Sequence, residues 1–411
     1  MKKLLIFFAM NACIFFFGAS CASAKAVGDV NINTTTFPDE FLRAYVIENI
    51  DTNKDQILQQ TEAEAVTKIS FTKFKDADEQ GSGDEEKVVQ LHYYTEDEFT
   101  FDFKGLEYFN NLTELTVRLF GGLTKDDAEY PVKVSHVDSL YKLKNLKLLE
   151  INKSDLKSFD CSKLPKLEKL DLTECSELKK MTFKGNKKLK KISLSDFPKL
   201  STLDVSSLGS LTSMQLRAVD VKNIKFGKKN SSLKSLEIGS YTNQYCKKLT
   251  TLDLSKLTGL KKLYITWQKN LKKVDVSHNK KLSYIYMEKC VGLTKLAPKK
   301  NKELTEVDIW NCKNLKTLDL SANYKLNSLT LDGMEVKTIL LSKKNKLTFL
   351  RYANAKLKKF NVKNINTKTL KELQLYGNKL KKVDVRKYKK LGNLDVDKGV
   401  KVIGWEKTSA N

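Results

Sequence analysis

A run of oxygen-bearing side chains near the N-terminus could hold a metal ion. Asp51, Asn53 and Asp55 alternate along the chain, and Glu62 follows them. Calcium takes six to eight hard oxygen ligands, and three alternating side chains, the Ile57 carbonyl and a bidentate Glu62 could supply most of these. The spacing therefore predicts a calcium site formed by Asp51, Asn53, Asp55, Ile57 and Glu62.

Aromatic side chains form a second candidate site, suited to recognition. Tyr264 and Tyr286 occupy the same place in a six-residue phrase, Leu-x-x-Leu-x-Leu, that recurs about every eleven residues. Exposed aromatics offer a partner large contact area at low entropic cost, whereas the alternative is that they only cover a pleated sheet. Polar neighbours such as Glu288, Glu306 and Asp308 favour a binding patch. The patch comprises Tyr264, Trp267, Tyr284, Tyr286 and Trp310, with Phe349 and Tyr376 further along.

A column of lysines is the third candidate. In every second phrase the residue after the first apolar position is mostly lysine, and stacked phrases would bring these ammonium groups to about 4.8 Å from one another. The ammonium groups of such a column repel one another. A bound polyanion such as teichoic acid, lipopolysaccharide or a sulfated glycan would compensate their charge. The alternative is solubility in a lysine-rich chain. The residues are Lys157, Lys179, Lys222, Lys272, Lys316, Lys337, Lys358, Lys381 and Lys401.

Catalysis has little support in the sequence. His92, His136 and His278 are scattered, and none sits with a Ser or Cys and an acid in a recognisable nucleophile arrangement. The sequence has no Gly-rich phosphate loop and no HExxH motif. A recurring aspartate is interpreted as a turn-capping residue that bonds backbone donors of adjacent coils: Asp160, Asp204, Asp253, Asp275, Asp319 and Asp384. We expect a protein that is not an enzyme.

The recurring phrase determines the fold that must position these residues. From Leu146 to the C-terminus a variable phrase alternates with one that ends in Asp-x-Ser, so the full repeat is about 22 residues with two extended segments. We call the variable segment A and the other segment B. A short fixed period indicates a solenoid whose units bury their apolar side chains only by stacking. The first, fourth and sixth positions of each phrase should point inward.

The run from Leu167 through Leu170 and Leu172 to Cys175 resembles the leucine-rich repeat formula. That formula has Asn or Cys three residues after the last strand leucine, where this chain repeatedly places Asn186, Asn279, Cys290, Asn301, Cys312 and Asn323. The nested 21–22-residue repeats resemble those of secreted and surface proteins of bacteria, internalin-like in general role. The resemblance covers roughly residues 99–405. It implies a β-rich solenoid with two parallel strands per coil and a recognition function, without naming a ligand.

Two helices should hold the candidate calcium loop. Residues 37–50 predict the first, with Phe41, Tyr45 and Ile50 on its apolar face. A second should begin at a Thr61-x-x-Glu64 capping box and carry Val66 and Ile69. This helix-loop-helix over residues 37–70 resembles an EF-hand.

One loop position departs from the EF-hand pattern. Gln56 stands where the family has Gly, and a non-glycine residue at the positive φ required there costs on the order of 1 kcal/mol. Two hypotheses therefore stay open. The loop binds calcium, or it is a metal-free remnant that caps the end of the solenoid, which would otherwise expose apolar surface and strand edges.

Residues 1–24 have the features of a secretory signal peptide. Lys2 and Lys3 precede an apolar stretch, and Ala22-Ser23-Ala24 forms a small-residue cleavage site. The competing interpretation makes Cys21 a lipidated N-terminus. No second hydrophobic span follows, so the sequence predicts a secreted or cell-surface protein without a transmembrane segment.

Five cysteines remain after cleavage: Cys161, Cys175, Cys246, Cys290 and Cys312. They are interpreted as small buried residues, because their odd number argues against a complete disulfide framework. Cys290 and Cys312 lie one repeat apart, a separation that suits a disulfide under oxidising conditions.

The charge distribution marks two modules. Residues 25–105 contain 18 acidic and 8 basic residues, whereas residues 106–411 contain 31 acidic and 64 basic ones. The expected organisation is a signal peptide (1–24), an acidic cap (25–98), a first repeat with an insertion at 118–135 (99–145), about twelve nested repeats with a second insertion at 239–248 (146–405), and a tail (406–411).

We therefore expect an exported bacterial leucine-rich repeat adhesin or recognition protein. Its variable strand face would bind a host or microbial surface protein or glycan. The alternatives are an electrostatic binder of anionic envelope polymers and a structural spacer without a ligand. Nucleic acid is not an expected partner, because no recognition module accompanies the positive charge.

Overall fold

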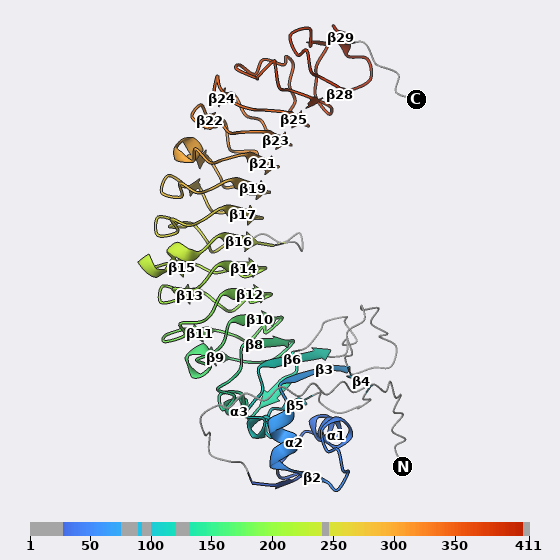
Figure 1. The fold of residues 1–411 in the computed structure, drawn as a ribbon. Helices are drawn as coiled ribbons and strands as arrows, with labels where there is room; N and C mark the ends of the chain where they lie inside the picture. The colour runs from blue at the N-terminus through green and yellow to red at the C-terminus, as the bar shows by residue number, and fades with distance from the viewer. Residues whose placement is uncertain (1–27, 75–88, 93–99, 121–130, 241–245, 406–411) are drawn as a thin grey trace. The chain divides into compact units, whose positions relative to one another are not determined.

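A computed structural model describes residues 28–74, 89–92, 100–120, 131–240 and 246–405. The chain divides into two compact units, residues 1–199 and 200–411. Each unit is a stack of parallel β-coils (Figure 1). None of the helices in the described ranges is both long enough and apolar enough to span a bilayer.

The first unit begins with a small helical cap. Helix α1 (Glu40–Asn49) starts at Asp39, whose carboxylate accepts a hydrogen bond from the Leu42 amide at 2.9 Å. Strands β1 (Val30–Asn31) and β2 (Ile57–Leu58) pair in antiparallel fashion, and α2 (Gln60–Ala65) follows. Phe41, Tyr45 and Ile50 are buried, as the apolar periodicity of the first predicted helix requires.

The second predicted helix was wrong in extent. Helix α2 ends at Ala65, its capping box is formed by Gln59 and Glu62, and Ile69 lies in strand β3 (Lys68–Phe74) instead. β-branched and aromatic residues follow Ala65, and they favour an extended chain. The Phe71 ring lies 5.3 Å from the rings of both Phe41 and Phe101, so aromatic packing joins the cap to the first coils.

Two columns of strands build the rest of the first unit. The A sheet is parallel in the order β4-β3-β6-β8-β10-β12. Its strands other than β3 are β4 (Val89–His92), β6 (Glu114–Phe120), β8 (Leu148–Asn152), β10 (Lys169–Thr173) and β12 (Lys191–Ser195). The B side has the parallel pairs β5 (Thr100–Asp102) with β7 (Lys133–Ser135) and β9 (Ser158–Asp160) with β11 (Lys180–Thr182). A short helix, α3 (Val137–Leu140), follows β7.

The second unit repeats this plan. Its parallel A strands are, in order, β14 (Ser213–Arg217), β16 (Ser235–Gly239), β17 (Lys262–Thr266), β19 (Tyr284–Glu288), β21 (Glu306–Trp310), β23 (Ser328–Asp332), β25 (Phe349–Ala353), β26 (Glu372–Gln374) and β28 (Asn393–Asp395). On the B side the pairs are β13 (Thr202–Asp204) with β15 (Asn223–Lys225), β18 (Lys273–Val274) with β20 (Lys295–Leu296), β22 (Thr317–Leu320) with β24 (Thr338–Leu341), and β27 (Lys382–Asp384) with β29 (Lys401–Ile403).

The predicted parallel solenoid is confirmed, with two strands in most of the described coils. Leu170 pairs with Leu149 on one side and Ile192 on the other, in a register that brings equivalent positions of successive repeats together. All three side chains are buried, whereas the residues that alternate with them point outward. Residues 118–120, placed in the first predicted insertion, continue strand β6, and residues 133–135 form β7. Most of the second insertion, residues 241–245, lies outside the described ranges.

The turn after most A strands contains a residue with positive φ. Lys153, Ala218, Lys289 and Asn311 have φ between 49° and 55°. In this conformation each backbone N–H donates to the last strand residue of the following coil, as from Lys289 to the Trp310 carbonyl at 2.8 Å. These turns therefore continue the hydrogen-bonding between coils beyond the strand itself.

Buried asparagines form a ladder at the B turns. Asn301 is fully buried, and its Nδ2 donates to the carbonyls of Val276 at 2.9 Å and Asn279 at 2.7 Å, both in the preceding coil. Asn323 repeats this pattern one coil later. Each of these carbonyls already accepts a backbone amide of its own turn, so the side-chain amide adds a second hydrogen bond that joins one coil to the next.

We expect Asn301→Ala to lower the free energy of unfolding by about 1–3 kcal/mol, because two buried hydrogen bonds between successive coils are lost. Chemical denaturation followed by circular dichroism measures this change. The control is Lys302→Ala at the adjacent exposed position. Equal midpoints for the two variants would contradict a role for the ladder in stability.

Candidate recognition surface

Strands β17, β19 and β21 bring most of the predicted aromatic residues together. Tyr264 lies directly opposite Tyr286, which in turn lies opposite Asp308. The Tyr264 ring centroid is 5.3 Å from that of Tyr284, edge to face, and 6.3 Å from that of Tyr286. All three side chains are half-buried. The prediction that these tyrosines cluster on one sheet face is confirmed, while their binding role stays a prediction.

Hydrogen bonds to carboxylates fix two of these tyrosines. Tyr284 Oη donates to Asp308 Oδ2 at 3.0 Å, and Tyr286 Oη donates to Glu288 Oε2 at 2.9 Å. Burial and the nearby Asp308 raise the pKa of the Tyr284 hydroxyl. Burial, followed by the charge of Asp308, also raises the pKa of Glu306. The surface therefore combines aromatic rings with closely spaced acidic groups.

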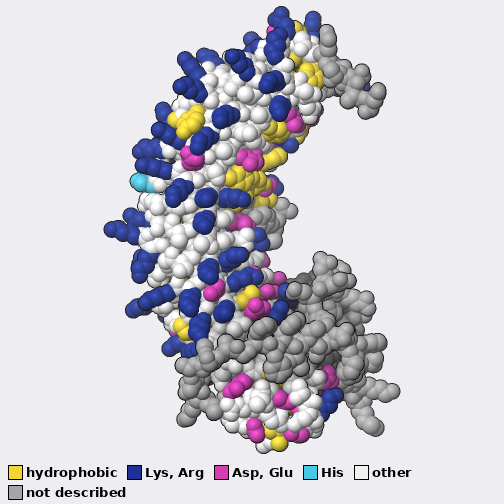
Figure 2. Space-filling view, in the orientation of Figure 1, with side chains coloured by type: hydrophobic (Ala, Val, Ile, Leu, Met, Phe, Trp, Pro, Cys, Tyr) yellow, Lys and Arg dark blue, Asp and Glu magenta, His cyan; other side chains and the backbone are white. Residues whose placement is uncertain are grey.

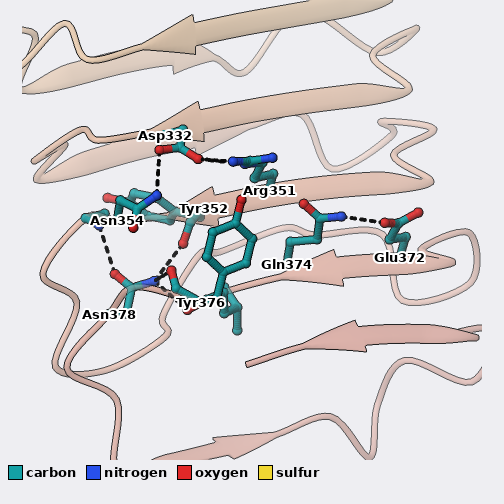
Figure 3. Close-up of polar contacts among 10 residues, drawn as sticks. Asp332, Arg351, Tyr352, Asn354, Glu372, Gln374, Tyr376 and Asn378 are labelled. Carbon is teal, nitrogen blue, oxygen red and sulfur yellow. Dashed lines mark hydrogen bonds and ion pairs between the residues drawn. The ribbon is translucent and has the colours of Figure 1, made fainter. Parts of the chain in front are cut away.

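Trp310 belongs to a neighbouring cluster that the sequence did not reveal. The Arg351 guanidinium lies 4.5 Å from the centre of the Trp310 ring and 4.9 Å from that of Tyr376. Arg351 Nε also donates to Asp332 Oδ2 at 2.7 Å. Figure 3 shows Asp332 between Asn354 and Arg351, with the Tyr376 ring beside them. The outward position of Arg351 on its strand was the only sequence signal for this contact.

Trp267 does not belong to the exposed patch, so that prediction was wrong. Its side chain is only 8% exposed, and the Lys289 ammonium lies 3.8 Å from the centre of its ring. Strand alternation predicts exposure only within a strand. Trp267 follows β17 in a left-handed conformation with φ of 53°, so the alternation does not extend to its side chain.

The predicted lysine column is present only in parts on the B side: Lys222 neighbours Ser201 and Lys272 neighbours Thr294, while three lysine pairs are adjacent, Lys316 with Lys337 among them. The Lys179 amide donates to the Lys157 carbonyl, and the Lys401 amide donates to the Lys381 carbonyl. All but Lys316 are exposed, and Lys316 lies 3.5 Å from Glu335. Figure 2 shows Lys and Arg side chains spread widely over the face in view, with few acidic ones. Binding of a polyanion remains a prediction.

A groove near this column was not foreseen. Residues 250–253 match the B phrase but form no strand, and they lie between the strand pairs that end at β15 and begin at β18. The groove there has a volume of about 760 Å³, and Lys272 of the predicted column lies in its wall. It is lined by Asn223, Ile224, Thr250, Thr251, Leu252, Asp253, Asn270, Lys272, Lys273 and Asp275.

The recurring aspartates cap turns, as expected, although within their own coil. Asp275 Oδ1 accepts from the Ser277 amide at 3.0 Å, and Asp319 Oδ1 does the same from Ser321. The donors were expected to come from adjacent coils, but an aspartate side chain reaches the amide two residues ahead more directly. The hydrogen bonds to Ser277, together with Lys273, lower the pKa of Asp275 to about 2.

Two histidines lie in different surroundings. His136 Nδ1 lies 2.8 Å from Asp102 in the first unit, and His278 lies 3.2 Å from the hydroxyl of its neighbour Ser277 in the second. The side chain of His92 lies outside the described part of the structure.

The candidate calcium loop has some of the expected conformation. Gln56 has φ of 63°, as predicted, and its amide donates to Asp51 Oδ2 at 2.9 Å. Asp51 is 2% exposed, and its Oδ1 has no hydrogen-bond partner. Asn53 and Asp55 accept from backbone amides within the loop, while Glu62 accepts from the Thr52 amide. In the described ranges, no three His, Cys, Asp or Glu side chains converge to hold a metal ion.

The five cysteines of the repeats are buried and free. Burial raises the pKa of Cys175 and of Cys246 to about 11. Cys290 and Cys312 contact each other, and this contact together with burial raises the pKa of the Cys312 thiol. Elevated pKa values leave little thiolate near neutral pH, so these groups are poor nucleophiles.

Comparisons with known proteins give similarity in structure only. No protein-family model matches the chain, and no curated protein matches it. Among solved structures, the functional domain of InlJ from Listeria monocytogenes, which includes a cysteine ladder, is 20% identical, with a TM-score of 0.42 over 88% of this chain and 78% of that one. The internalin InlF from Listeria monocytogenes is 15% identical, with a TM-score of 0.47 over 92% and 98%. A leucine-rich repeat protein of Leptospira interrogans is 16% identical, with a TM-score of 0.36 over 68% and 83%.

The buried thiols should report the integrity of the coils. We expect a disulfide reagent such as DTNB to modify the five thiols at least about a hundredfold more slowly in the native protein than in denaturant at pH 8. Rapid modification of the native protein would contradict the observed burial.

The buried thiols also make stability depend on pH. Because the folded pKa of Cys175 and Cys246 exceeds the ordinary value of 9.0, their contribution to stability is complete below that pH and is lost toward pH 11.

Proposed function

We propose that this chain is a recognition protein that binds a protein or glycan partner through the A strands of its second unit. The observation that carries the proposal is the half-buried tyrosine cluster, which lies beside carboxylates on the outward face of three adjacent strands. Aromatic anchors of this kind dominate many binding interfaces.

The rigidity of the cluster supports this role. The backbone register fixes the separation of Tyr264 and Tyr286, and a hydrogen bond to Glu288 orients the Tyr286 ring. A surface that is ordered before binding loses less side-chain entropy when a partner arrives. We propose recognition rather than catalysis, because these aromatic and acidic side chains are ordered on an outward strand face where a partner can contact them.

The proposed location is outside the cell or on its surface. The signal-peptide residues 1–24 and the alternative lipidation site Cys21 lie outside the described part of the structure, so their sequence features alone support this location. A host or microbial surface molecule is the proposed partner.

Replacing Tyr264, Tyr286 and Trp310 by Ala should weaken binding to target cells at least about tenfold, because each change removes aromatic contact area. Flow cytometry with labelled mature chain, over a concentration series on host cells and on bacterial envelopes, measures the affinity. Tyr324→Ala is the matched control, since Tyr324 is exposed on a turn outside the A strands. Unchanged affinity of the triple variant, with an intact melting temperature, would exclude the A face.

A second candidate function is electrostatic binding of an anionic envelope polymer through the lysine column. The groove that contains Lys272 favours it, because Lys273 and the hydroxyl-bearing Thr250 and Thr251 line the same wall, although Asp253 and Asp275 lie there too. Such binding should weaken steeply between low and physiological ionic strength, whereas aromatic contacts should persist. Absence of binding to either cell type at any salt concentration would favour a structural spacer.

We also propose that the loop at residues 51–62 binds calcium. Support comes from the buried Asp51 Oδ1, which lacks a partner, and from the left-handed Gln56. Asp51, Asn53, Asp55, Glu62 and the Ile57 carbonyl would hold the ion, and Glu62 would have to exchange its bond to the Thr52 amide. A bound cation would offset the charge of the carboxylates and stiffen the cap.

Calcium should raise the melting temperature of the protein by several degrees relative to chelator, because a ligand that binds only the folded state stabilises it. Asp51→Asn should abolish this shift, while Asp138→Asn, at an exposed site in the same unit, should not. Calorimetric titration of both variants provides a direct readout. An equal melting temperature in calcium and in chelator would favour the metal-free cap.

A further inference from the structure

An unusual charge distribution surrounds the tyrosine cluster. We name as the acidic-tyrosine patch the residues Tyr264, Tyr284, Tyr286, Glu288, Glu306 and Asp308. Residues 106–411 carry about twice as many basic as acidic residues, yet within the described ranges no ion pair joins Glu288, Glu306 or Asp308 to a lysine or arginine. Figure 2 shows hydrophobic and acidic side chains together at the edge where these strands end, with Lys and Arg side chains beside them.

Carboxylates elsewhere on the coils are commonly paired. Glu168 meets Lys190 at 2.6 Å and Glu303 meets Lys325 at 2.7 Å, each with a lysine 22 residues further along. The repeat therefore places a lysine within ion-pair distance of these two acids, whereas Lys262 acts on Glu306 of the patch without an ion pair in the described ranges. Partly buried carboxylates that lie close together repel each other: burial and the charge of Asp308 raise the pKa of Glu306, while Lys262 lowers it.

The adjacent Arg351 cluster shows which chemistry this face can hold. Its guanidinium contacts two aromatic rings, Trp310 and Tyr376, and pairs with one carboxylate, Asp332. The acidic-tyrosine patch presents the same two kinds of group within two strands of that site, and within the described ranges its three carboxylates form no ion pair. A ring face beside a carboxylate attracts a guanidinium or ammonium group through both cation–π and ionic forces.

Resting on the proposed function, we propose that the acidic-tyrosine patch binds an arginine or lysine side chain of a protein partner, seated over the Tyr264 and Tyr286 rings beside Glu306 and Asp308. A metal ion is not the proposed ligand, because the described acidic groups do not converge to hold one. A neutral glycan would leave the unpaired carboxylates without a counter-charge.

The rest of the chain restricts the partner further. The net positive charge of residues 106–411 repels a polycation, although salt screens this repulsion beyond about 8 Å under physiological conditions. The partner segment should therefore present one or two basic side chains flanked by apolar or acidic residues, and not a basic run.

Selection of a random twelve-residue peptide library on the full chain tests the proposal, with competition by the Tyr264→Ala variant to retain only patch-dependent peptides. We expect the enriched peptides to share one Arg or Lys. Replacing that residue by the neutral isostere citrulline or norleucine should reduce affinity about tenfold or more for the native chain. The same replacement should have little effect on binding to the Glu306→Gln/Asp308→Asn variant, because the carboxylates are then absent.

Glu303→Gln is the matched control, since it removes a carboxylate that is already paired in a turn, and it should retain the full preference for the basic peptide. Melting temperatures confirm that each variant is folded. Patch-dependent peptides without a basic residue, or an equal effect of the isostere on both chains, would overturn the cation proposal and leave the binding function intact. A selection that enriches no peptide dependent on Tyr264 would overturn both.

Discussion

The whole structure depends on one constraint, the stacking of successive coils in a constant register. Each coil alone is too thin to bury its leucines, so a side chain such as Leu170 is shielded only because Leu149 and Ile192 lie on either side of it. The same stacking aligns the backbone groups that must be paired away from water. Asparagines in the B turns and left-handed residues after the A strands extend that pairing to the turns.

This constraint separates the two faces of every strand. The inward positions repeat because they must match their neighbours in size, whereas the outward positions are free of that requirement. In the second unit the outward positions collect tyrosines and carboxylates on the A strands, while lysines line the B side. One repetitive scaffold thus presents two surfaces that differ in chemistry, although each also carries side chains of the other charge, such as Lys262 on the A strands and Asp275 on the B side.

Periodicity accounts for how much the sequence could predict. The solenoid, its inward residues and the proximity of Tyr264 to Tyr286 all follow from a 22-residue repeat with strand alternation. The positive φ of Gln56 follows from the motif to which the loop is similar. These features depend on the repeat spacing, the strand alternation and the loop motif. Each of these patterns can be read directly from a single sequence.

The remaining features depend on contacts that the pattern does not encode. Trp267 is buried because its turn leaves the strand, where alternation no longer applies. Helix α2 stops early because the following residues join the A sheet, a tertiary preference that overrides the helical pattern. Arg351 reaches Trp310 across two coils, and a groove lies beside residues 250–253, where a segment with the usual B phrase forms no strand. Both features depend on how neighbouring coils meet, which the pattern of a single repeat does not specify.

The constant register also has an evolutionary consequence. Because Tyr264, Tyr286 and Asp308 meet only through their common position in successive coils, duplication of one complete repeat would insert a strand into the surface without disturbing the core on either side. The inserted strand would bring its own outward residues into the same row. A lineage of such proteins can therefore acquire a new specificity by copying and diverging single coils, while the inherited fold stays unchanged.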